Sequence, residues 1–180
     1  MDELSELLQL RRAKLDVWRA EGSEPFGVTF PDTLSVASVV ADFAEEKAVR
    51  LAGRVVAFRD MGKSIFGHFL DQTGRLQFYA NKQTLGETAL ESFRRLDLGD
   101  IIGLEGTLFT TRTGEKTVKI SKFVLLSKSL RPLPSQWHGL SDTEARYRQR
   151  YLDLIVNEDV RRTLTLRSRI VSEIASTAVR

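Results

Sequence analysis

The chain has 180 residues, of which 42% are hydrophobic and 28% charged, and its formal net charge is +3. This composition is typical of a soluble globular domain, and no apolar run approaches the roughly 18 residues that cross a bilayer. The acidic start excludes a secretory signal. The absence of cysteine excludes thiolate metal sites and indicates a reducing cytoplasm, and His68 and His138 lack a metal-ligand spacing.

Charge is distributed unevenly along the chain. Residues 1–48 hold 5 Lys/Arg against 10 Asp/Glu, residues 49–128 hold 13 against 8, and residues 129–180 hold 9 against 6. The middle and the end therefore suit a polyanionic partner. An ordinary solvated surface explains the same counts, so charge alone does not decide the function.

The first segment, 2–21, carries apolar residues at helical spacing, and Gly22 follows it as a stop signal. Its basic residues include Arg11 and Arg12, which are candidate RNA contacts. A second, short helix is expected over 35–47.

The central segment has the apolar and β-branched pattern of strands. Strands are expected over 49–58, 65–70, 76–81, 101–110 and 117–126, with a helix over 87–96. Three strands, a helix and two strands is the order of an OB-fold, a five-stranded Greek-key barrel. The predicted fold class is therefore α+β with a mostly β core, although the pattern alone leaves other small β-barrels open.

The last part begins with a segment, 129–140, in which two prolines stand one residue apart, so it is predicted to be a stiff linker. Ser141 and Glu144 form a capping box, which predicts a helix from there through Tyr151. A long helix is expected over 160–180. The expected domains are a helical extension (1–48), the barrel (49–128), the linker (129–140) and a helical segment that opens a further domain (141–180).

Strand alternation predicts which side chains lie on the outer face of the second and third strands, where OB-folds bind oligonucleotides. The apolar row Leu76, Phe78 and Ala80 should face inward. Unpaired bases stack on aromatic rings, and an amide can donate to and accept from a Watson–Crick edge. The side chains predicted to face outward are Phe66, His68, Gln77 and Tyr79.

The loops beside this face add charged candidates. Arg59 and Lys63 can hold phosphates or a base edge, and Glu115 can accept from a base amino or imino group. Other interpretations stay open: Phe66 packing against a neighbouring domain, His68 as a partly buried structural residue, Tyr79 as a cap of the barrel, and Lys63 as a solvated loop residue.

No paired carboxylates, nucleophile–base arrangement or phosphate loop occurs in the sequence, and Gly62-Lys63 lacks the spacing of a P-loop. No catalytic or metal-ligating residue is therefore predicted in this chain.

Four stretches resemble class II lysyl-tRNA synthetases, and the resemblance extends over essentially the whole chain. The most specific is LRPLPSQWHGLSDTEARYRQRYLDLI, which resembles the hinge of that family. The others are LLQLRRAKLDVWRAEGSEPF, LAGRVVAFRDMGKSIFGHFLDQTGRLQFYA and DLGDIIGLEGTLFTTRTGE. The aspartate and asparagine relatives share the OB domain and a looser form of the hinge.

The resemblance implies an anticodon-binding role for four residues. Phe66 matches the aromatic that stacks on the central base of the uridine-rich anticodon of lysine tRNA, and Gln77 matches the amide that reads a uridine edge. Arg59 and Glu115 fall where the family contacts anticodon bases, whereas His68 has no family role that carries over.

For the full-length protein, the resemblance implies a cytoplasmic, homodimeric lysine–tRNA ligase that uses ATP and Mg²⁺. The motifs for that chemistry lie downstream in the family, so this chain is expected to bind tRNA without aminoacylating it. Two other functions stay open: a stand-alone module for single-stranded nucleic acid, and a protein-interaction domain in which the barrel is only a scaffold.

Overall fold

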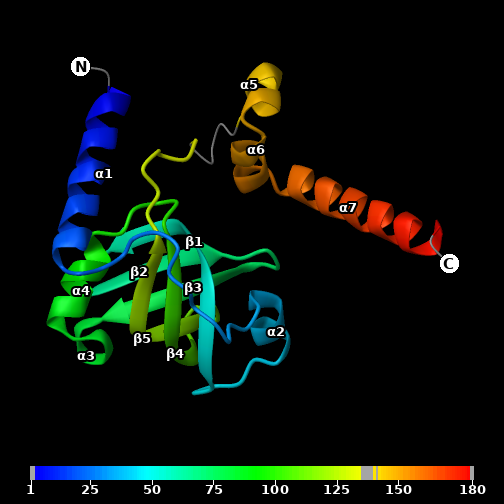
Figure 1. The fold of residues 1–180 in the computed structure, drawn as a ribbon. Coiled ribbons are helices and arrows are strands. Elements are labelled where there is room, and N and C mark those ends of the chain that lie inside the picture. Colours follow the sequence, from blue (N-terminus) through cyan, green and yellow to red (C-terminus); the bar gives the residue numbers. More distant parts are fainter. Residues whose placement is uncertain (1–2, 135–139, 141, 179–180) are drawn as a thin grey trace. The chain divides into compact units, whose positions relative to one another are not determined.

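The computed structural model describes residues 3–134, 140 and 142–178 (Figure 1). The chain divides into two compact units, Met1–Pro132 and Leu133–Arg180.

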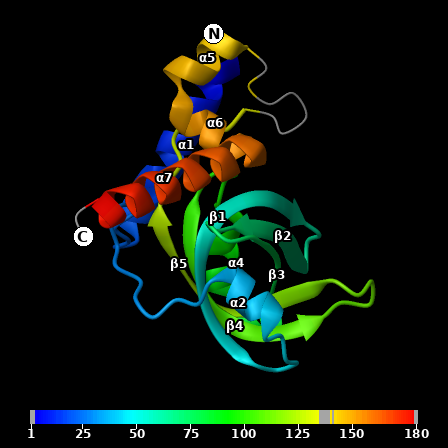
Figure 2. The same cartoon turned by 90° about the vertical axis from the view of Figure 1, so that its right-hand side faces the viewer.

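The first unit is built around a closed barrel of five strands (Figure 2). The strands are β1 (Ala48–Asp60), β2 (Ser64–Leu70), β3 (Arg75–Asn81), β4 (Ile101–Thr110) and β5 (Lys116–Ser127). Around the barrel their order is β1-β2-β3-β5-β4, with β3 and β5 parallel and the other neighbouring pairs antiparallel. This arrangement confirms the predicted OB-fold, and each predicted strand is present within two residues of its predicted ends.

Side chains on β2 and β3 alternate between the barrel interior and its outer face, as predicted. Every second residue of each strand is buried, including Phe69 on β2 and Phe78 on β3, and the residues between them are partly exposed. The predicted outward set therefore does lie on the outer face of the barrel.

Gly67 is needed where β2 crosses β1. A Cβ atom at this position would lie 2.2 Å from the carbonyl oxygen of Ala57 and 2.3 Å from the ring of Phe78. The β1–β2 register shifts between Val55 and Ala57, so the strand pair bends here. A residue without a side chain is therefore required for the barrel to close.

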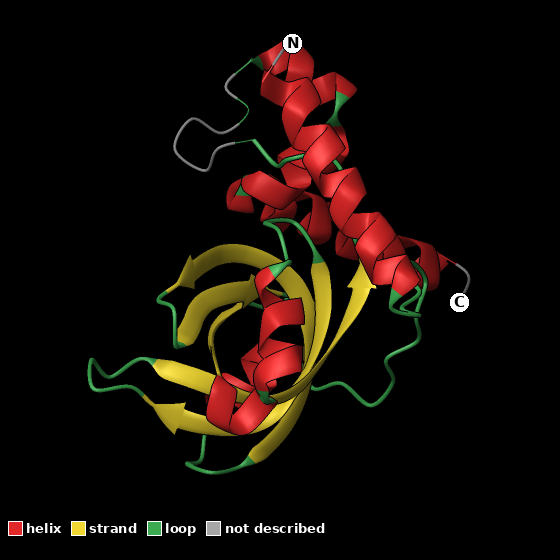
Figure 3. Cartoon of the chain, turned by 90° about the vertical axis from the view of Figure 1, so that its left-hand side faces the viewer, coloured by secondary structure: helices red, strands yellow, loops and turns green. Residues whose placement is uncertain are grey.

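Two short helices, α3 (Lys82–Leu85) and α4 (Glu87–Arg94), follow β3 and lie across one end of the barrel (Figure 3). The helix predicted over 87–96 is confirmed as α4, whereas α3 was not predicted. Asn81 caps α3 by accepting a hydrogen bond from the backbone N–H of Thr84, and Gly86, at φ +84°, separates the two helices.

Phe93 from α4 fills the end of the barrel. Its ring lies 5.9, 5.5 and 4.9 Å, centroid to centroid, from the rings of Phe58, Phe78 and Phe123. This aromatic cluster connects the helical plug to three strands.

The N-terminal helices α1 (Glu3–Ala20) and α2 (Val36–Ala41) also belong to the barrel unit. Trp18 of α1 is buried with its ring edge-on to Phe123. The predicted extent of α2 to residue 47 was wrong. The backbone of Glu46 and Lys47 instead forms hydrogen bonds with Leu108 of β4.

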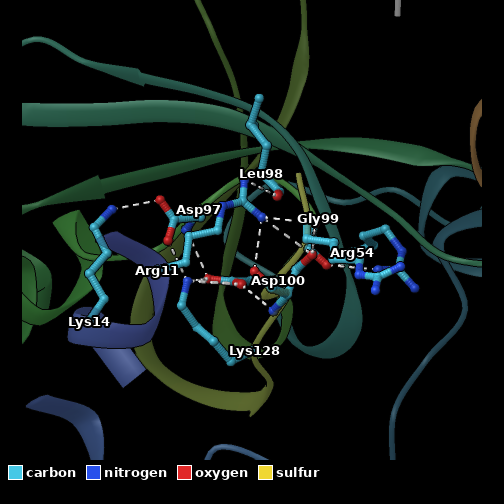
Figure 4. Close-up of polar contacts among 10 residues, drawn as sticks. Arg11, Lys14, Arg54, Asp97, Leu98, Gly99, Asp100 and Lys128 are labelled. Carbon is cyan, nitrogen blue, oxygen red and sulfur yellow. Dashed lines mark hydrogen bonds and ion pairs between the residues drawn. The ribbon is translucent and has the colours of Figure 1, made fainter. Parts of the chain in front are cut away.

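A buried polar network joins α1 to the end of β5 (Figure 4). The ammonium of Lys128 lies 2.5 Å from Asp97 and 2.8 Å from Asp100, and Lys14 of α1 lies 2.6 Å from the second oxygen of Asp97. Lys128 and Asp100 are almost completely shielded from solvent. The opposite charges of Lys128 and Asp100 compensate each other where both side chains are shielded from solvent, whereas Lys14 and Asp97 stay partly exposed.

Arg11 takes part in the same network. Its guanidinium donates to the backbone carbonyl oxygens of Leu98, Ser129 and Arg131 at 3.2, 2.9 and 3.1 Å, and the residue is buried. The structure therefore speaks against Arg11 as an RNA contact, because its donors are already used within the protein.

The second unit contains α5 (Thr143–Arg148), α6 (Arg150–Val156) and α7 (Glu158–Ala178). The helix predicted to continue through Tyr151 is interrupted at Gln149. The predicted cap, Ser141, lies outside the described residues, and the side chain of Asp142 caps α5 by accepting from two backbone N–H groups.

Asp153 stabilises the junction between the two short helices. Its carboxylate accepts hydrogen bonds from Arg146 of α5, from Arg150 and from the amide of Asn157. The last helix, α7, exposes a set of large apolar side chains: Leu166, Ile170, Val171 and Ile174. No helix in the described part of the chain combines the length and apolar character that a membrane span requires.

Candidate nucleic-acid interface

A hollow of about 570 Å³ lies on the outer face of the barrel, over β2 and β3 and between two loops. The loops are those that join β1 to β2 and β4 to β5. The lining residues are Arg59, Met61, Ser64, Phe66, Gln77, Tyr79, Phe109, Thr111, Arg112 and Thr113. Four of the nine residues predicted from the sequence, namely Arg59, Phe66, Gln77 and Tyr79, therefore meet at one surface.

A row of three aromatic rings borders the hollow. Phe66 on β2 and Tyr79 on β3 are cross-strand partners with ring centroids 4.7 Å apart, and Phe109 on β4 lies 5.8 Å beyond Tyr79. The tyrosine hydroxyl accepts a hydrogen bond from Asn81 at 3.1 Å. Partly exposed rings of this kind offer flat apolar surfaces on which a planar ligand can stack.

Next to the rings, polar side chains form a continuous chain of hydrogen bonds. Glu115 accepts from the amide nitrogen of Gln77 at 2.6 Å, and its other carboxylate oxygen lies 2.8 Å from Nε2 of His68. The hydroxyl of Thr117 donates to Oε1 of Gln77 at 2.7 Å. Glu115 and His68 are thus adjacent to the hollow and connected to it through Gln77.

Cationic side chains lie around the same surface. Arg59, which the sequence placed in a loop, lies near the end of β1, and Arg112 lies in the β4–β5 loop; both line the hollow. Lys63 is exposed in the β1–β2 loop but does not line the hollow. Guanidinium groups here can neutralise phosphates of a bound strand.

The β1–β2 loop is held in place by α4. The guanidinium of Arg94 donates to a carboxylate oxygen of Asp60 at 2.9 Å and to the carbonyl oxygen of Gly62. The other oxygen of Asp60 accepts from the backbone N–H of Gly62 at 2.8 Å. The loop therefore has a defined conformation beside the hollow.

One further candidate lies away from the hollow. Arg12 is exposed on α1, and its role as an RNA contact stays a prediction. The RNA-binding roles of Phe66, Gln77, Arg59 and Glu115 also stay predictions, although their geometry suits stacking, edge reading and phosphate contact.

Phe109 and Arg112 were not among the residues predicted from the sequence. Phe109 was detectable, because it follows the buried Leu108 on β4 and alternation places it on the outer face. Arg112 had no such signal, since its position depends on how the β4–β5 loop folds back toward β3.

In the part of the chain that the structure describes, no group of three or more His, Cys, Asp or Glu side chains could hold a metal ion. The described residues therefore do not fit the Mg²⁺ that the resemblance implies for the full-length protein. We assign no metal-dependent step to them.

Residues 49–126 match the family of OB-fold nucleic acid binding domains, in its tRNA anticodon form. The chain is 49% identical over 174 residues to the lysine–tRNA ligase of Carboxydothermus hydrogenoformans, an alignment that covers 96% of this chain and 36% of the relative. It is 47% identical to the lysine–tRNA ligases of Pelotomaculum thermopropionicum and Listeria monocytogenes; both alignments cover 94% of this chain, and 34% and 36% of the relatives.

Proposed function

Because this chain corresponds to the N-terminal region of the lysyl-tRNA synthetases, with an OB-fold nucleic acid binding domain at its centre, we propose that it binds the anticodon of lysine tRNA. The unpaired bases bind in the hollow on the outer face of the barrel.

One observation carries this proposal: Phe66 and Gln77 line the same hollow from adjacent strands. A base stacked on the ring of Phe66 therefore places its edge within reach of an amide. Stacking supplies affinity without regard to sequence, whereas the amide distinguishes one edge from another. Arg59 and Arg112 hold the phosphates on either side.

The chain spans about a third of the length of the curated relatives that it matches. The ligation of lysine to tRNA with ATP and Mg²⁺ is accordingly a proposal for a longer protein, and it rests on those relatives. The homodimer and the cytoplasmic location also stay predictions. No step of the ligation is assigned to the described residues.

The proposal is tested by measuring the affinity of the chain for a lysine anticodon stem-loop, and for the same stem-loop with its central uridine replaced by cytidine. We expect the replacement to weaken binding by about 1–3 kcal/mol, the usual cost of a mismatched edge. Equal affinity for both would instead indicate a module without sequence preference. No binding at low salt would favour a protein-interaction domain.

A further inference from the structure

We infer that Thr117 and His68 are positioning residues that hold the Gln77 amide in one orientation. The amide then matches only a base edge on which the hydrogen-bond donor and acceptor stand in one order. This inference rests on the proposed function and extends it from a binding face to the source of its selectivity. It is carried by the hydrogen bonds around Gln77.

The chemistry of the partners determines which end of the amide is which. An ionised carboxylate can only accept hydrogen bonds. The terminal atom of Gln77 that lies 2.6 Å from Oε2 of Glu115 must therefore be the NH₂ group. The carbonyl oxygen then faces Thr117, whose hydroxyl donates to it at 2.7 Å.

Thr117 is a fixed donor. It is completely buried on β5, directly opposite Gln77 in the parallel β3–β5 pair. Its single proton has two acceptors within reach, of which Oε1 of Gln77 at 2.7 Å is nearer than the backbone carbonyl oxygen of Glu115 at 3.1 Å. A rotation that removed the hydroxyl from Gln77 would leave the carbonyl of Gln77 without this partner.

Glu115 needs a second hydrogen-bond partner to hold its carboxylate in place, because the residue is exposed just before β5. His68 supplies it: Nε2 of its ring lies 2.8 Å from the carboxylate oxygen that Gln77 does not use. His68 is also the cross-strand partner of Gln77 on β2. The histidine therefore holds the carboxylate beside the amide, and each side chain of the chain His68–Glu115–Gln77–Thr117 restrains the next.

An inverted amide would be disfavoured at both ends. Its carbonyl oxygen would face the carboxylate of Glu115, and two acceptors would oppose each other with no hydrogen between them. Its NH₂ group would face the hydroxyl of Thr117, whose proton would lose its acceptor on Gln77 and be left with the more distant carbonyl oxygen of Glu115, at 3.1 Å. In the observed orientation, one N–H and one lone pair of Gln77 are left for a ligand.

This restraint matters because uracil and cytosine present their hydrogen-bond donor and acceptor in opposite order. Uracil offers a carbonyl acceptor beside an imino donor, whereas cytosine offers an amino donor beside a ring-nitrogen acceptor. An amide that inverts freely can match either base. An amide that is locked, with the base held in place by stacking on Phe66, can match only one.

The inference predicts the effect of removing the hydroxyl of Thr117. In Thr117→Val, which keeps the shape of the side chain, the preference of the chain for the uridine stem-loop over the cytidine stem-loop should fall by at least about fivefold, the lower limit for one bidentate contact. Thr117→Ser keeps the hydroxyl and should keep the preference. Binding is measured by fluorescence anisotropy with labelled stem-loops.

His68 provides a second pair of variants at the surface, where folding is little affected. His68→Ala should lower the same preference, and His68→Gln, which retains a side-chain donor, should restore most of it. A residue with only a structural role would change the affinity for both stem-loops equally and would not show this recovery.

The outcomes are distinguishable. If the unmodified chain binds neither stem-loop, or binds both equally, the proposed function fails. If the unmodified chain prefers uridine and both Thr117→Val and His68→Ala keep that preference in full, the inference is overturned. If thermal unfolding shows that Thr117→Val does not fold, the His68 pair decides alone.

Discussion

Phe66 packs on a neighbouring ring and also remains partly exposed at the edge of a hollow. Tyr79 supports it from one side, so the orientation of the ring is restricted before any ligand binds. A ring held in this way loses little conformational freedom when a base stacks on it.

At this scale we predict that Phe66→Ala weakens binding of the matched stem-loop by about 1–3 kcal/mol, because one stacking surface is lost. Phe66→Tyr retains the ring and serves as the matched control, with little change expected. Titration calorimetry with both variants measures the difference. Wild-type affinity in Phe66→Ala would remove this residue from the stacking role.

Single-residue features were the most predictable part of the site. A period of two along 65–70 and 76–81 was sufficient to place Phe66, Gln77 and Tyr79 outward, because one apolar face had to close the barrel. The hydrogen bond from Thr117 to Gln77 was not predictable, since it depends on the parallel pairing of strands that are distant in the sequence. Arg11 was misjudged for the same reason: exposure of a helical arginine depends on what packs against the helix.

At the scale of elements, the buried network determines how α1 is attached to the barrel. Lys128 lies at the end of β5 and bonds to both Asp97 and Asp100 in the segment before β4. Removing one partner of a buried ion pair leaves the other charged and desolvated, which is costly.

We therefore predict that Lys128→Met lowers the free energy of unfolding by about 3–5 kcal/mol. Lys47→Met is the matched control. It removes an ion pair with the exposed Asp42, and such pairs contribute little, so stability should be nearly unchanged. Urea unfolding followed by circular dichroism measures both. Equal stability of the two variants would show that the buried network is not a main source of stability.

The same network gives a pH dependence. Burial by itself raises the pKa of Asp97, but hydrogen bonds and charge from Lys128 and Lys14 outweigh it and hold the pKa below its ordinary value of 3.8. Because the folded pKa is the lower one, the stabilisation is fully present above the unfolded value and is lost as the pH falls through the folded value. We expect the free energy of unfolding to decrease below about pH 4.

This contribution can be assigned by comparing the chain with Asp97→Asn, whose acid dependence should be shallower below the same pH. Identical pH profiles of the melting temperature would show that Asp97 does not contribute to acid unfolding.

Helices and strands were predicted well where a periodic pattern was long. They were predicted poorly where the backbone forms hydrogen bonds with a distant strand or side chain instead of continuing a helix. The strand limits and the extents of α1 and α7 followed from periodicity. The end of α2 did not, because residues 46 and 47 bond to β4 instead of continuing a helix. The break at Gln149 had no sequence signal of its own, since it depends on three donors that converge on Asp153.

At the scale of the whole molecule, acidic and basic residues are distributed unevenly along the sequence. Residues 49–128, which form the barrel and its plug, carry an excess of five positive charges, whereas residues 1–48 carry an excess of five negative charges. Arg59 and Arg112, which line the hollow, add an attraction for RNA phosphates to the stacking on the rings.

We predict that affinity for the stem-loop falls as salt concentration rises, and that Arg59→Gln and Arg112→Gln each reduce the slope of log K against log salt by about 0.7, the value for one single-strand phosphate contact. Lys122→Gln, at an exposed position that does not line the hollow, is the control and should leave the slope unchanged. An unaltered slope in the arginine variants would place the phosphates elsewhere.

The carbonyl oxygens that Arg11 holds belong to Ser129 and Arg131, which lie 118 and 120 positions further along the chain. Proteolytic removal of the first twenty residues would therefore affect residues 129–131, at the C-terminal end of the barrel unit. The carbonyl oxygens of Ser129 and Arg131 would lose their guanidinium donor, so the segment after β5 would become less restrained.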